Sequence, residues 1–294
     1  MTSAAAPTLD LSRLPLPHAV VAPAFEQLLA ARLADLRSRA PDIDALLESD
    51  PAVKLQEVDA YRELLVLARI DDAVRATMLA FAVGADLDHL AAIHGLSRLV
   101  IDAEAQPPIY ETDAQLRHRV LLAPEALAAA GPHAAWVAHA LAAHAGVRAV
   151  DVWSPVPGQV SVAVQAHGGD GAPSPELVER VRAHLSQPHI KPLTDILSVK
   201  PVLNIPYAIA VEVFVLPGPA PELVRREVAA SLSAMADARR LPARDVPVSA
   251  VIAAATTGAV DRVVVTSPAG DIARGHGEVA VCTAVDVVVR VHDG

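Results

Sequence analysis

The segment "SDPAVKLQEVDAYRELLVLARIDDAVRATMLAFAVGADLDHLAAIHG", residues 49–95, decides how the N-terminal part of this chain folds. Asp50 is placed to cap a helix, and Pro51 stands at the first helical position, where its missing N–H is not needed. Apolar residues then recur three and four positions apart on two neighbouring stripes. This pattern predicts a long helix whose apolar surface is too wide for one partner to cover.

The end of the same segment predicts a sharp corner. Gly84 can adopt the left-handed conformation that ends the long helix, Asp86 can cap a short second helix, and Gly95 can close it. Arg62 and Arg69 have no acidic residue four positions further along the helix. Two interpretations of these arginines stay open, a solvated face or a contact with a partner.

The flanking sequence predicts an α+β protein. Prolines punctuate the first 24 residues, which favours an extended arm, and helical spacing follows from 24 to 39. After residue 131, helical patterns alternate with segments rich in β-branched residues. We therefore expect an N-terminal arm and helical layer followed by two small α/β units, with the parts spanning 1–40, 41–128, 129–205 and 206–294.

Two pairs of similar segments predict an internal repeat. A PxPELV motif begins at Pro173 and again at Pro219, 46 positions later, whereas "HAGVRAVDVWSP" and "TGAVDRVVVTSP" begin 113 positions apart. Unequal offsets exclude a simple tandem array. They favour a permuted pair of similar units.

Composition narrows the class of protein. The chain has 294 residues with 24 Lys and Arg against 34 Asp and Glu, a net charge of −10, so no basic patch predicts nucleic-acid binding. Cys282 stands alone in a valine-rich run, which predicts a buried structural thiol in a reducing compartment. We expect neither an export signal nor membrane insertion, because the apolar runs are far shorter than a bilayer-spanning helix.

The sequence offers weak candidates for chemistry. Asp86, Asp88, His89 and His94 carry metal-ligating groups, but the two histidines are five positions apart and so point to different helix faces. The Gly-rich stretch from 165 to 173 lacks the lysine of a phosphate-binding loop. We expect no catalytic residue, cofactor or metal. A metal-dependent hydrolase that uses this cluster and a soluble ligand-binding module remain the alternatives.

The segment from 49 to 95 resembles the signature region of the baseplate J-like family, in "SDPAVKL", "AYRELLVLARIDDAVRA" and "LAFAVGADLDHLAAIHG". The resemblance continues through "YETDAQLRHRVLLAPEAL", "AGPHAAWVAHALAAHAGVRAVDVWSPVPGQV", "KPLTDILSV", "GPAPELVRREV" and "AVDRVVVTSPAGDI". It covers nearly the whole chain and is weakest in the first forty residues.

This resemblance implies a structural protein and no enzyme. Members of the family look like wedge subunits of contractile phage tails and related injection particles, present in the tail baseplate and assembled in the bacterial host cytoplasm. The implied partners are a second copy of the chain, other wedge subunits, the central hub or spike and sheath-proximal proteins. The matching positions are expected to determine fold and assembly: Asp50, Pro51, Tyr61, Arg62, Arg69, Ala76, Gly84, Asp86, Leu87 and Asp88.

Overall fold

The computed structural model describes residues 10–15, 17, 24–42, 47–128, 131–218 and 220–292. They form two compact units. A helical unit contains residues 9–97 and 113–117, and an α/β unit contains 98–112 and the chain from 118 onward. The fold class is α+β, as predicted. The predicted extended arm lies largely outside the described residues.

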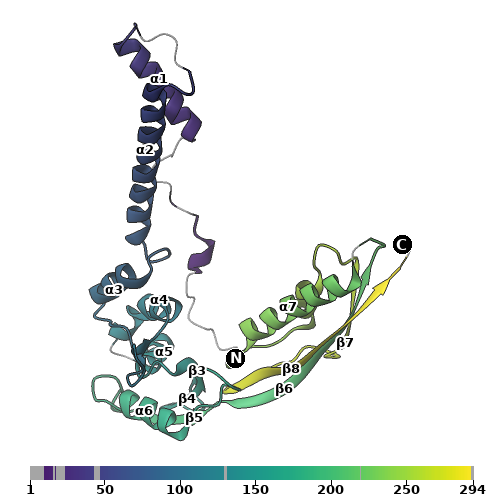
Figure 1. Cartoon of the computed structure of the whole chain (residues 1–294). Helices are drawn as coiled ribbons and strands as arrows, with labels where there is room; N and C mark the ends of the chain where they lie inside the picture. The colour runs from purple at the N-terminus through teal and green to yellow at the C-terminus, as the bar shows by residue number, and fades with distance from the viewer. Residues whose placement is uncertain are drawn as a thin grey trace. The chain divides into compact units, whose positions relative to one another are not determined.

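The helical unit is built around a hairpin of two helices (Figure 1). A short 3-10 helix, η1 (Leu11–Arg13), precedes α1 (Phe25–Arg39), α2 (Pro51–Ala76) and α3 (Gly84–Ile93). Helix α1 packs along α2, where Leu28, Val53 and Ala60 are buried. The Arg32 guanidinium donates two hydrogen bonds to Glu63, at 2.9 and 2.7 Å, and fixes the pairing of the two helices.

The start of α2 agrees with the sequence, whereas its end does not. The Asp50 carboxylate accepts a hydrogen bond from the Ala52 N–H at 2.8 Å, so the predicted cap is confirmed. The helix stops at Ala76, and Gly84, with φ of +54°, opens α3 instead of ending α2. Asp86 lies in the first turn of α3, and Val83 holds the cap position that the sequence analysis gave to Asp86.

A short connecting region enters the α/β unit. It contains β1 (Val100–Asp102), β2 (Ile109–Tyr110), helix α4 (Asp113–Leu122) and the 3-10 helix η2 (Glu125–Leu127). The two strands pair antiparallel. The buried Glu111 carboxylate accepts a hydrogen bond from the Leu99 N–H at 3.0 Å and forms an ion pair with the buried Arg119. A buried ion pair of this kind fixes local geometry because neither charge has water as an alternative partner.

The first α/β half runs through α5 (His133–Ala142), β3 (Val147–Trp153), β4 (Gln159–Ala166), α6 (Pro175–Leu185) and β5 (Ile196–Pro201). The sheet order is β3-β4-β5, with β3 antiparallel and β5 parallel to the central strand. Ser174 caps α6, because its hydroxyl oxygen accepts a hydrogen bond from the Leu177 N–H at 3.2 Å. The inward-facing residues of α6 pack into the core with residues of α5 and the sheet.

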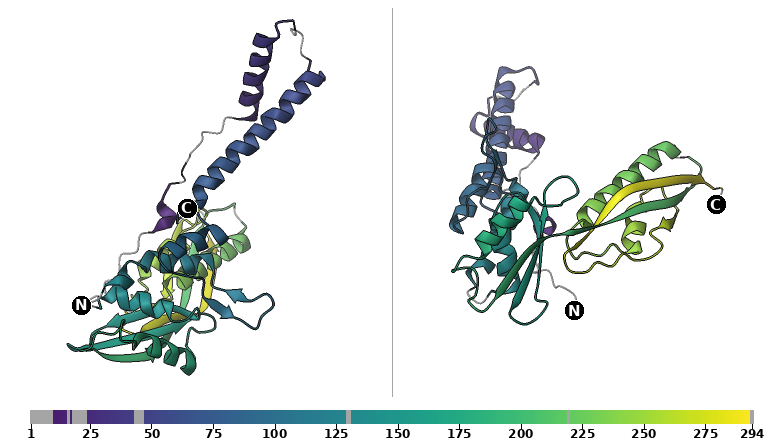
Figure 2. Two further views of the ribbon diagram at one scale, coloured as in Figure 1. Left: turned by 90° about the vertical axis from the view of Figure 1, so that its left-hand side faces the viewer. Right: turned by 90° about the horizontal axis from the view of Figure 1, so that it is seen from below.

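The second α/β half runs through β6 (Leu203–Val215), α7 (Pro221–Arg239), α8 (Val248–Ala255), β7 (Arg262–Ser267) and β8 (Glu278–Val291). The sheet order is β7-β6-β8, with β7 antiparallel and β8 parallel to β6. Helix α7 lies along β8 (Figure 2) and buries Val224, Val228 and Leu232 in a core that it shares with residues of β6, β8 and α8.

The two halves share an arrangement of strand directions. In each sheet the central strand has an antiparallel neighbour on one side and a parallel neighbour on the other. The chain order differs, because α5 and β3 precede the central strand β4, whereas α8 and β7 follow the central strand β6 and helix α7. A circular permutation of the first half would place the parallel strand before the antiparallel one, whereas in the second half the parallel strand β8 comes last. The internal repeat itself stays a prediction.

Candidate assembly surface

Helix α4 fixes the corner between α2 and α3. The Arg117 guanidinium donates to the carbonyl oxygens of Leu79 and Ala82 at 2.8 and 2.7 Å. The Asp113 carboxylate accepts from the Gly84 N–H at 3.1 Å. Backbone groups left unpaired at helix ends must find partners. Here Arg117 and Asp113, about thirty positions later in the chain, are the partners of backbone groups at Leu79, Ala82 and Gly84. These contacts stabilise a non-helical turn after α2 ends at Ala76, before Gly84 is reached.

Helix α2 exposes large apolar side chains over much of its length. Leu55, Val58, Tyr61, Leu65 and Val66 are each at least half exposed. The helix is apolar on more than one side, as the sequence predicted, and α1 covers only part of it. An exposed apolar surface of this kind typically marks a protein–protein contact.

Two hollows lie along α2. One, of about 440 Å³, is lined by Phe25 of α1 and by Val58, Tyr61, Arg62 and Leu65 of α2. The other, of about 690 Å³, lies at the corner and is lined by residues that include Arg69, Asp72, Arg75, Phe81, Val83, Asp86 and His89. The helical unit therefore has concave, partly apolar surfaces next to Arg62 and Arg69, two of the residues expected to determine assembly.

The acidic and histidine cluster of the sequence analysis is spread over α3. Asp86, Asp88 and His89 lie in the helix and His94 is its C-terminal cap residue. Among the described residues, no group of three His, Cys, Asp or Glu side chains has the arrangement of a metal site. The geometry therefore gives the metal-dependent hydrolase no support. Likewise, no helix in the described part of the chain is long and apolar enough to cross a membrane.

The two α/β halves meet at a joint centred on Asp151 of β3. Its buried carboxylate accepts a hydrogen bond from the Gly277 N–H at 2.8 Å and contacts His276 Nδ1 at 3.0 Å. The His276 ring stacks on Trp153, with centroids 5.0 Å apart and planes 8° apart, and Lys200 Nζ lies 4.5 Å from the same Trp153 ring. We call these five residues the Asp151 cluster.

A second set of contacts completes the joint. The Gln165 side chain is fully buried, and its amide donates to the Arg240 carbonyl oxygen at 3.2 Å. The Arg240 guanidinium donates to the Gly169 carbonyl oxygen at 2.6 Å, and the Asn204 amide donates to that of Asp170 at 2.9 Å. Since buried polar groups without partners are costly, these hydrogen bonds hold the two halves in a defined relation.

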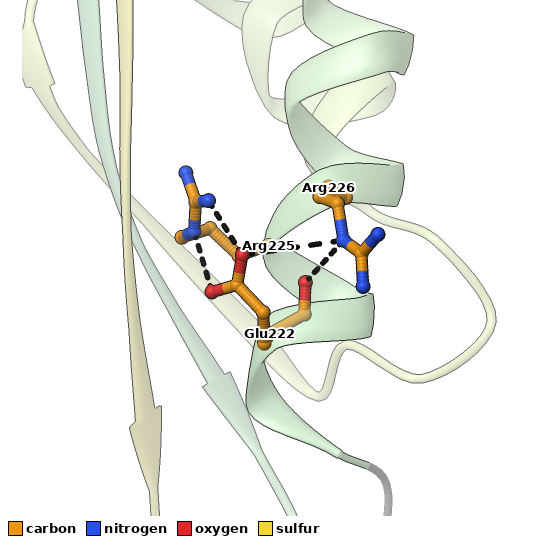
Figure 3. A network of polar contacts seen from close by, with 3 residues as sticks. All are labelled: Glu222, Arg225 and Arg226. Carbon is orange, nitrogen blue, oxygen red and sulfur yellow. Dashed lines mark hydrogen bonds and ion pairs between the residues drawn. The ribbon is translucent and has the colours of Figure 1, made fainter.

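The first turn of α7 carries an exposed network of charges (Figure 3). The Glu222 carboxylate accepts from the Arg225 guanidinium at 2.9 and 2.6 Å, and Arg226 lies 4.0 Å from it. The hydrogen bond from Arg225 lowers the pKa of Glu222, and the charge of Arg226 acts in the same direction. A carboxylate at a helix N-terminus also interacts favourably with the helix dipole. This network strengthens the start of α7 at the surface.

Burial shifts the pKa values of several titratable groups in the α/β unit. Desolvation lowers the pKa of His139 and of His184, whose rings face each other from α5 and α6 at 6.3 Å. Burial raises the pKa of the Cys282 thiol, which is only half-buried and donates to the Ala284 carbonyl oxygen at 3.3 Å. A thiol with a raised pKa is a poor nucleophile, in keeping with the structural role predicted for it.

The sequence analysis missed the residues that join distant parts of the chain. Arg117 and Asp113 hold the corner, and Asp151 and Gln165 hold the joint; the segments that contain them are quoted above, but no local pattern assigns these four residues a role. The one signal available was the position of Asp151 and Gln165 within strands of alternating apolar residues, where a polar side chain facing the core needs a partner. The identity of that partner required the fold.

Comparison with known proteins gives matches over most of the chain. Residues 48–105 match the baseplate J-like N-terminal domain, 128–201 the baseplate J-like central domain, and 207–288 the baseplate J-like protein C-terminal domain. The chain is also similar to baseplate protein J of Escherichia phage P2, at 35% identity over 300 residues that cover 98% of this chain and 99% of the relative.

Proposed function

This chain belongs to the baseplate J-like family of structural phage proteins, and from that premise we propose that it is a wedge subunit of a contractile tail. Its role is a structural one in a phage baseplate. In the proposal, copies of the chain form a ring around the central hub and spike, in a phage tail or a tail-like injection particle, and pass the contraction trigger to the sheath.

The observation that carries the proposal is the order of the three domain matches. They follow one another from residue 48 to residue 288, and the phage P2 relative aligns over almost its entire length. The exposed apolar residues of α2 add physical support, because permanent assemblies bury extensive apolar surface between subunits.

We assign the proposed contacts to different parts of the chain. The helical part, from 41 to 128, pairs with a second copy, and the α/β halves, 129–205 and 206–294, grip other wedge subunits, the hub or spike and sheath-proximal proteins. A change of ring diameter is a rearrangement of interfaces between two packed states and needs no chemical step. Assembly takes place in the host cytoplasm.

The selected residues divide into two roles in this proposal. Asp50, Pro51, Gly84 and Asp86 shape the ends of α2 and α3, and Asp88 belongs to the same short helix. Tyr61, Arg62 and Arg69 are exposed on α2 and are proposed to contact other subunits. All eight act on fold and assembly.

The test is to purify tail particles from the source by sedimentation and to quantify this chain against the sheath subunit by mass spectrometry. A wedge subunit gives a fixed ratio to sheath, well below one, that is the same in independent preparations. A chain that stays in the soluble fraction while the sheath sediments contradicts the proposal. Particles stripped of their sheath provide the control, because a baseplate subunit is retained in them.

A further inference from the structure

Strand β8 contains one residue more than its pairing with β6 uses. The register pairs Tyr207 with Cys282, and it pairs the next residue of β6, Ala208, with Ala284. Thr283 is skipped, which makes it the extra residue of a β-bulge. It is exposed, and its hydroxyl donates a hydrogen bond to the Tyr207 carbonyl oxygen at 3.0 Å.

A second bulge lies on the other side of β6, close to the first. Ala210 of β6 pairs with Ser267 of β7, and the register then shifts, so Thr266 is the extra residue of β7. The Thr266 hydroxyl donates to the Ala210 carbonyl oxygen at 2.9 Å, and the Ser267 hydroxyl donates to that of Ala208 at 2.9 Å. Both neighbours of β6 therefore carry a bulge within a few residues of each other.

The bulge in β8 separates valines that pack in two different cores. Before it, Val279 and Val281 pack at the joint between the two α/β halves. After it, Val285, Val287 and Val289 pack in the core that contains α7. All five valines stand at odd positions, and an uninterrupted strand would place them on one face. Because of the extra residue, the two groups lie on opposite faces of the strand.

Neither core needs Thr283 to be present. Ala280 and Cys282, before the bulge, already pack in the same core as the valines that follow it. Without Thr283, Cys282 would be followed directly by Ala284, whose partners on β6 are also consecutive. Residues that face the two sides of the sheet would then alternate without interruption. The packing of the two cores therefore does not explain why the chain contains this residue.

The shape of the sheet provides an explanation. A bulge bends the strand that contains it and increases the local twist. Strands β6 and β8 curve along their length (Figure 1), and both bulges border the same short stretch of β6. Three hydroxyl groups donate to the carbonyl oxygens of Tyr207, Ala208 and Ala210 there. These side chains supply donors where the bulges disrupt the ladder, and so they stabilise the bent form of the sheet.

We propose that Thr283 is a positioning residue whose bulge builds a fixed bend into the second α/β half and so directs the far ends of β6 and β8. Thr266 and Ser267 support the same bend from the other side of β6. The bend is a property of the chain alone. Its consequence rests on the proposed function, because in a baseplate the direction of these strands determines where the end of the second half meets its neighbours.

The first test deletes Thr283 from the full chain. This variant should still fold and unfold cooperatively in urea, as followed by circular dichroism, because every core residue of β8 keeps its face. Deletion of Val288 is the matched control. It removes a residue from the regular part of the strand, which turns the residues on one side of the gap to the wrong face, and it should abolish cooperative unfolding. If deletion of Thr283 also abolishes folding, the residue serves a core and the proposal is wrong.

The second test measures the bend by double electron–electron resonance. Spin labels are attached through Ala183→Cys on α6 and Val291→Cys at the end of β8, both at exposed positions, in a full chain that carries Cys282→Ser. Val291 lies about 26 Å of strand beyond Thr283, so a change of direction of about 10° there moves its label by roughly 5 Å. Deletion of Thr283 should shift the distance by this order, whereas Thr256→Val, which removes a hydroxyl contact at the end of α8, should not. An unchanged distance after the deletion overturns the proposal.

The third test examines assembly, with the variant produced in place of the parent chain. Deletion of Thr283 should lower the amount of the chain per sheath subunit in purified particles at least about tenfold, which the loss of a single good interface contact already achieves. A normal amount of the deletion variant in particles contradicts the role of the bend in assembly. An unchanged label distance while the parent is present in particles defeats this inference alone. A shifted distance while even the parent is absent from particles defeats the wedge role alone.

Discussion

Helix α2 and the joint between the two α/β halves use polar residues in opposite ways. At the joint, the buried Asp151 and Gln165 form hydrogen bonds with residues more than seventy positions away, so these polar side chains link distant parts of the same chain. On α2, Arg62 and Arg69 stand beside exposed leucine, valine and tyrosine side chains, and nothing in the described residues pairs with them.

The difference separates surfaces that fold the chain from surfaces that assemble it. The joint is held by hydrogen bonds between its own two halves, although Gln165 Oε1, Asn204 Oδ1 and Arg240 Nε are buried there without a hydrogen-bond partner among the described residues. A helix with exposed apolar side chains and unpaired charges gains from burial against another chain. Substitutions at the two places should therefore alter different quantities, stability at one and association at the other.

The largest expected effect is on the apolar core. Leu232 of α7 is fully buried, and Leu232→Ala should lower the free energy of unfolding by about 2–5 kcal/mol, because it removes buried methyl groups and leaves a cavity. Leu65→Ala on the exposed face of α2 should change the free energy of unfolding by less than about 0.5 kcal/mol. Urea unfolding followed by circular dichroism measures both. Equal losses would show that Leu65 is buried within the isolated chain.

The next effect is at the joint. Asp151→Ala leaves the buried Gly277 N–H without an acceptor and should cost about 2–3 kcal/mol, whereas Asp151→Asn retains an acceptor oxygen and should cost less. Glu212→Ala, which removes an exposed ion pair with Arg290, is the matched control and should give no measurable change. If Asp151→Ala unfolds at the same urea concentration as the parent, the joint is held by other contacts.

Local patterns predicted the helices and strands well. Asp50 and Pro51 at the start of α2 and Ser174 at the start of α6 each mark the beginning of their helix, because capping acts within a few residues. The same holds for the exposed apolar surface of α2. These features depend on neighbours in sequence, and local patterns therefore predict them.

Local patterns did not predict the residue at which α2 ends or the contacts that form the joint. The sequence places Gly84 as the residue that ends the long helix, but Arg117 and Asp113 satisfy the backbone of the corner from a separate helix, and α2 ends at Ala76. Asp151 pairs with a glycine 126 positions away. The fold topology determines which distant residues become partners, and the spacing of residues within one segment does not reveal that topology.

The corner gives a smaller effect that tests this point. Gly84 has φ of +54°, and a Cβ built there has no heavy atom within 4 Å. Gly84→Val should therefore cost only the backbone strain of a left-handed residue, about 1–2 kcal/mol, and should impair assembly into particles through a misplaced α3. Gly270→Val, also in open space and without a left-handed φ, is the control. A loss above about 4 kcal/mol would mean that the side chain meets packed atoms.

The smallest effect concerns pH and separates the α/β unit from α2, which contains no histidine. Burial lowers the pKa of His118, His139, His144, His167 and His184 below 6.5, so the folded chain resists their protonation. The unfolded chain then binds more protons below about pH 6.5, and the free energy of unfolding falls as the pH falls through that value.

Both tryptophans, Trp136 and Trp153, lie in the first α/β half, so their fluorescence reports on this region. The urea midpoint seen by fluorescence should decrease between about pH 7.5 and about pH 5.5, above the range in which carboxylates titrate. Replacing His139 and His184 together by glutamine should flatten the decrease, because the facing imidazoles no longer acquire charge. A urea midpoint that rises on acidification would mean that the protonated histidines form ion pairs in the folded α/β unit. Burial would then not be the dominant effect on their pKa values.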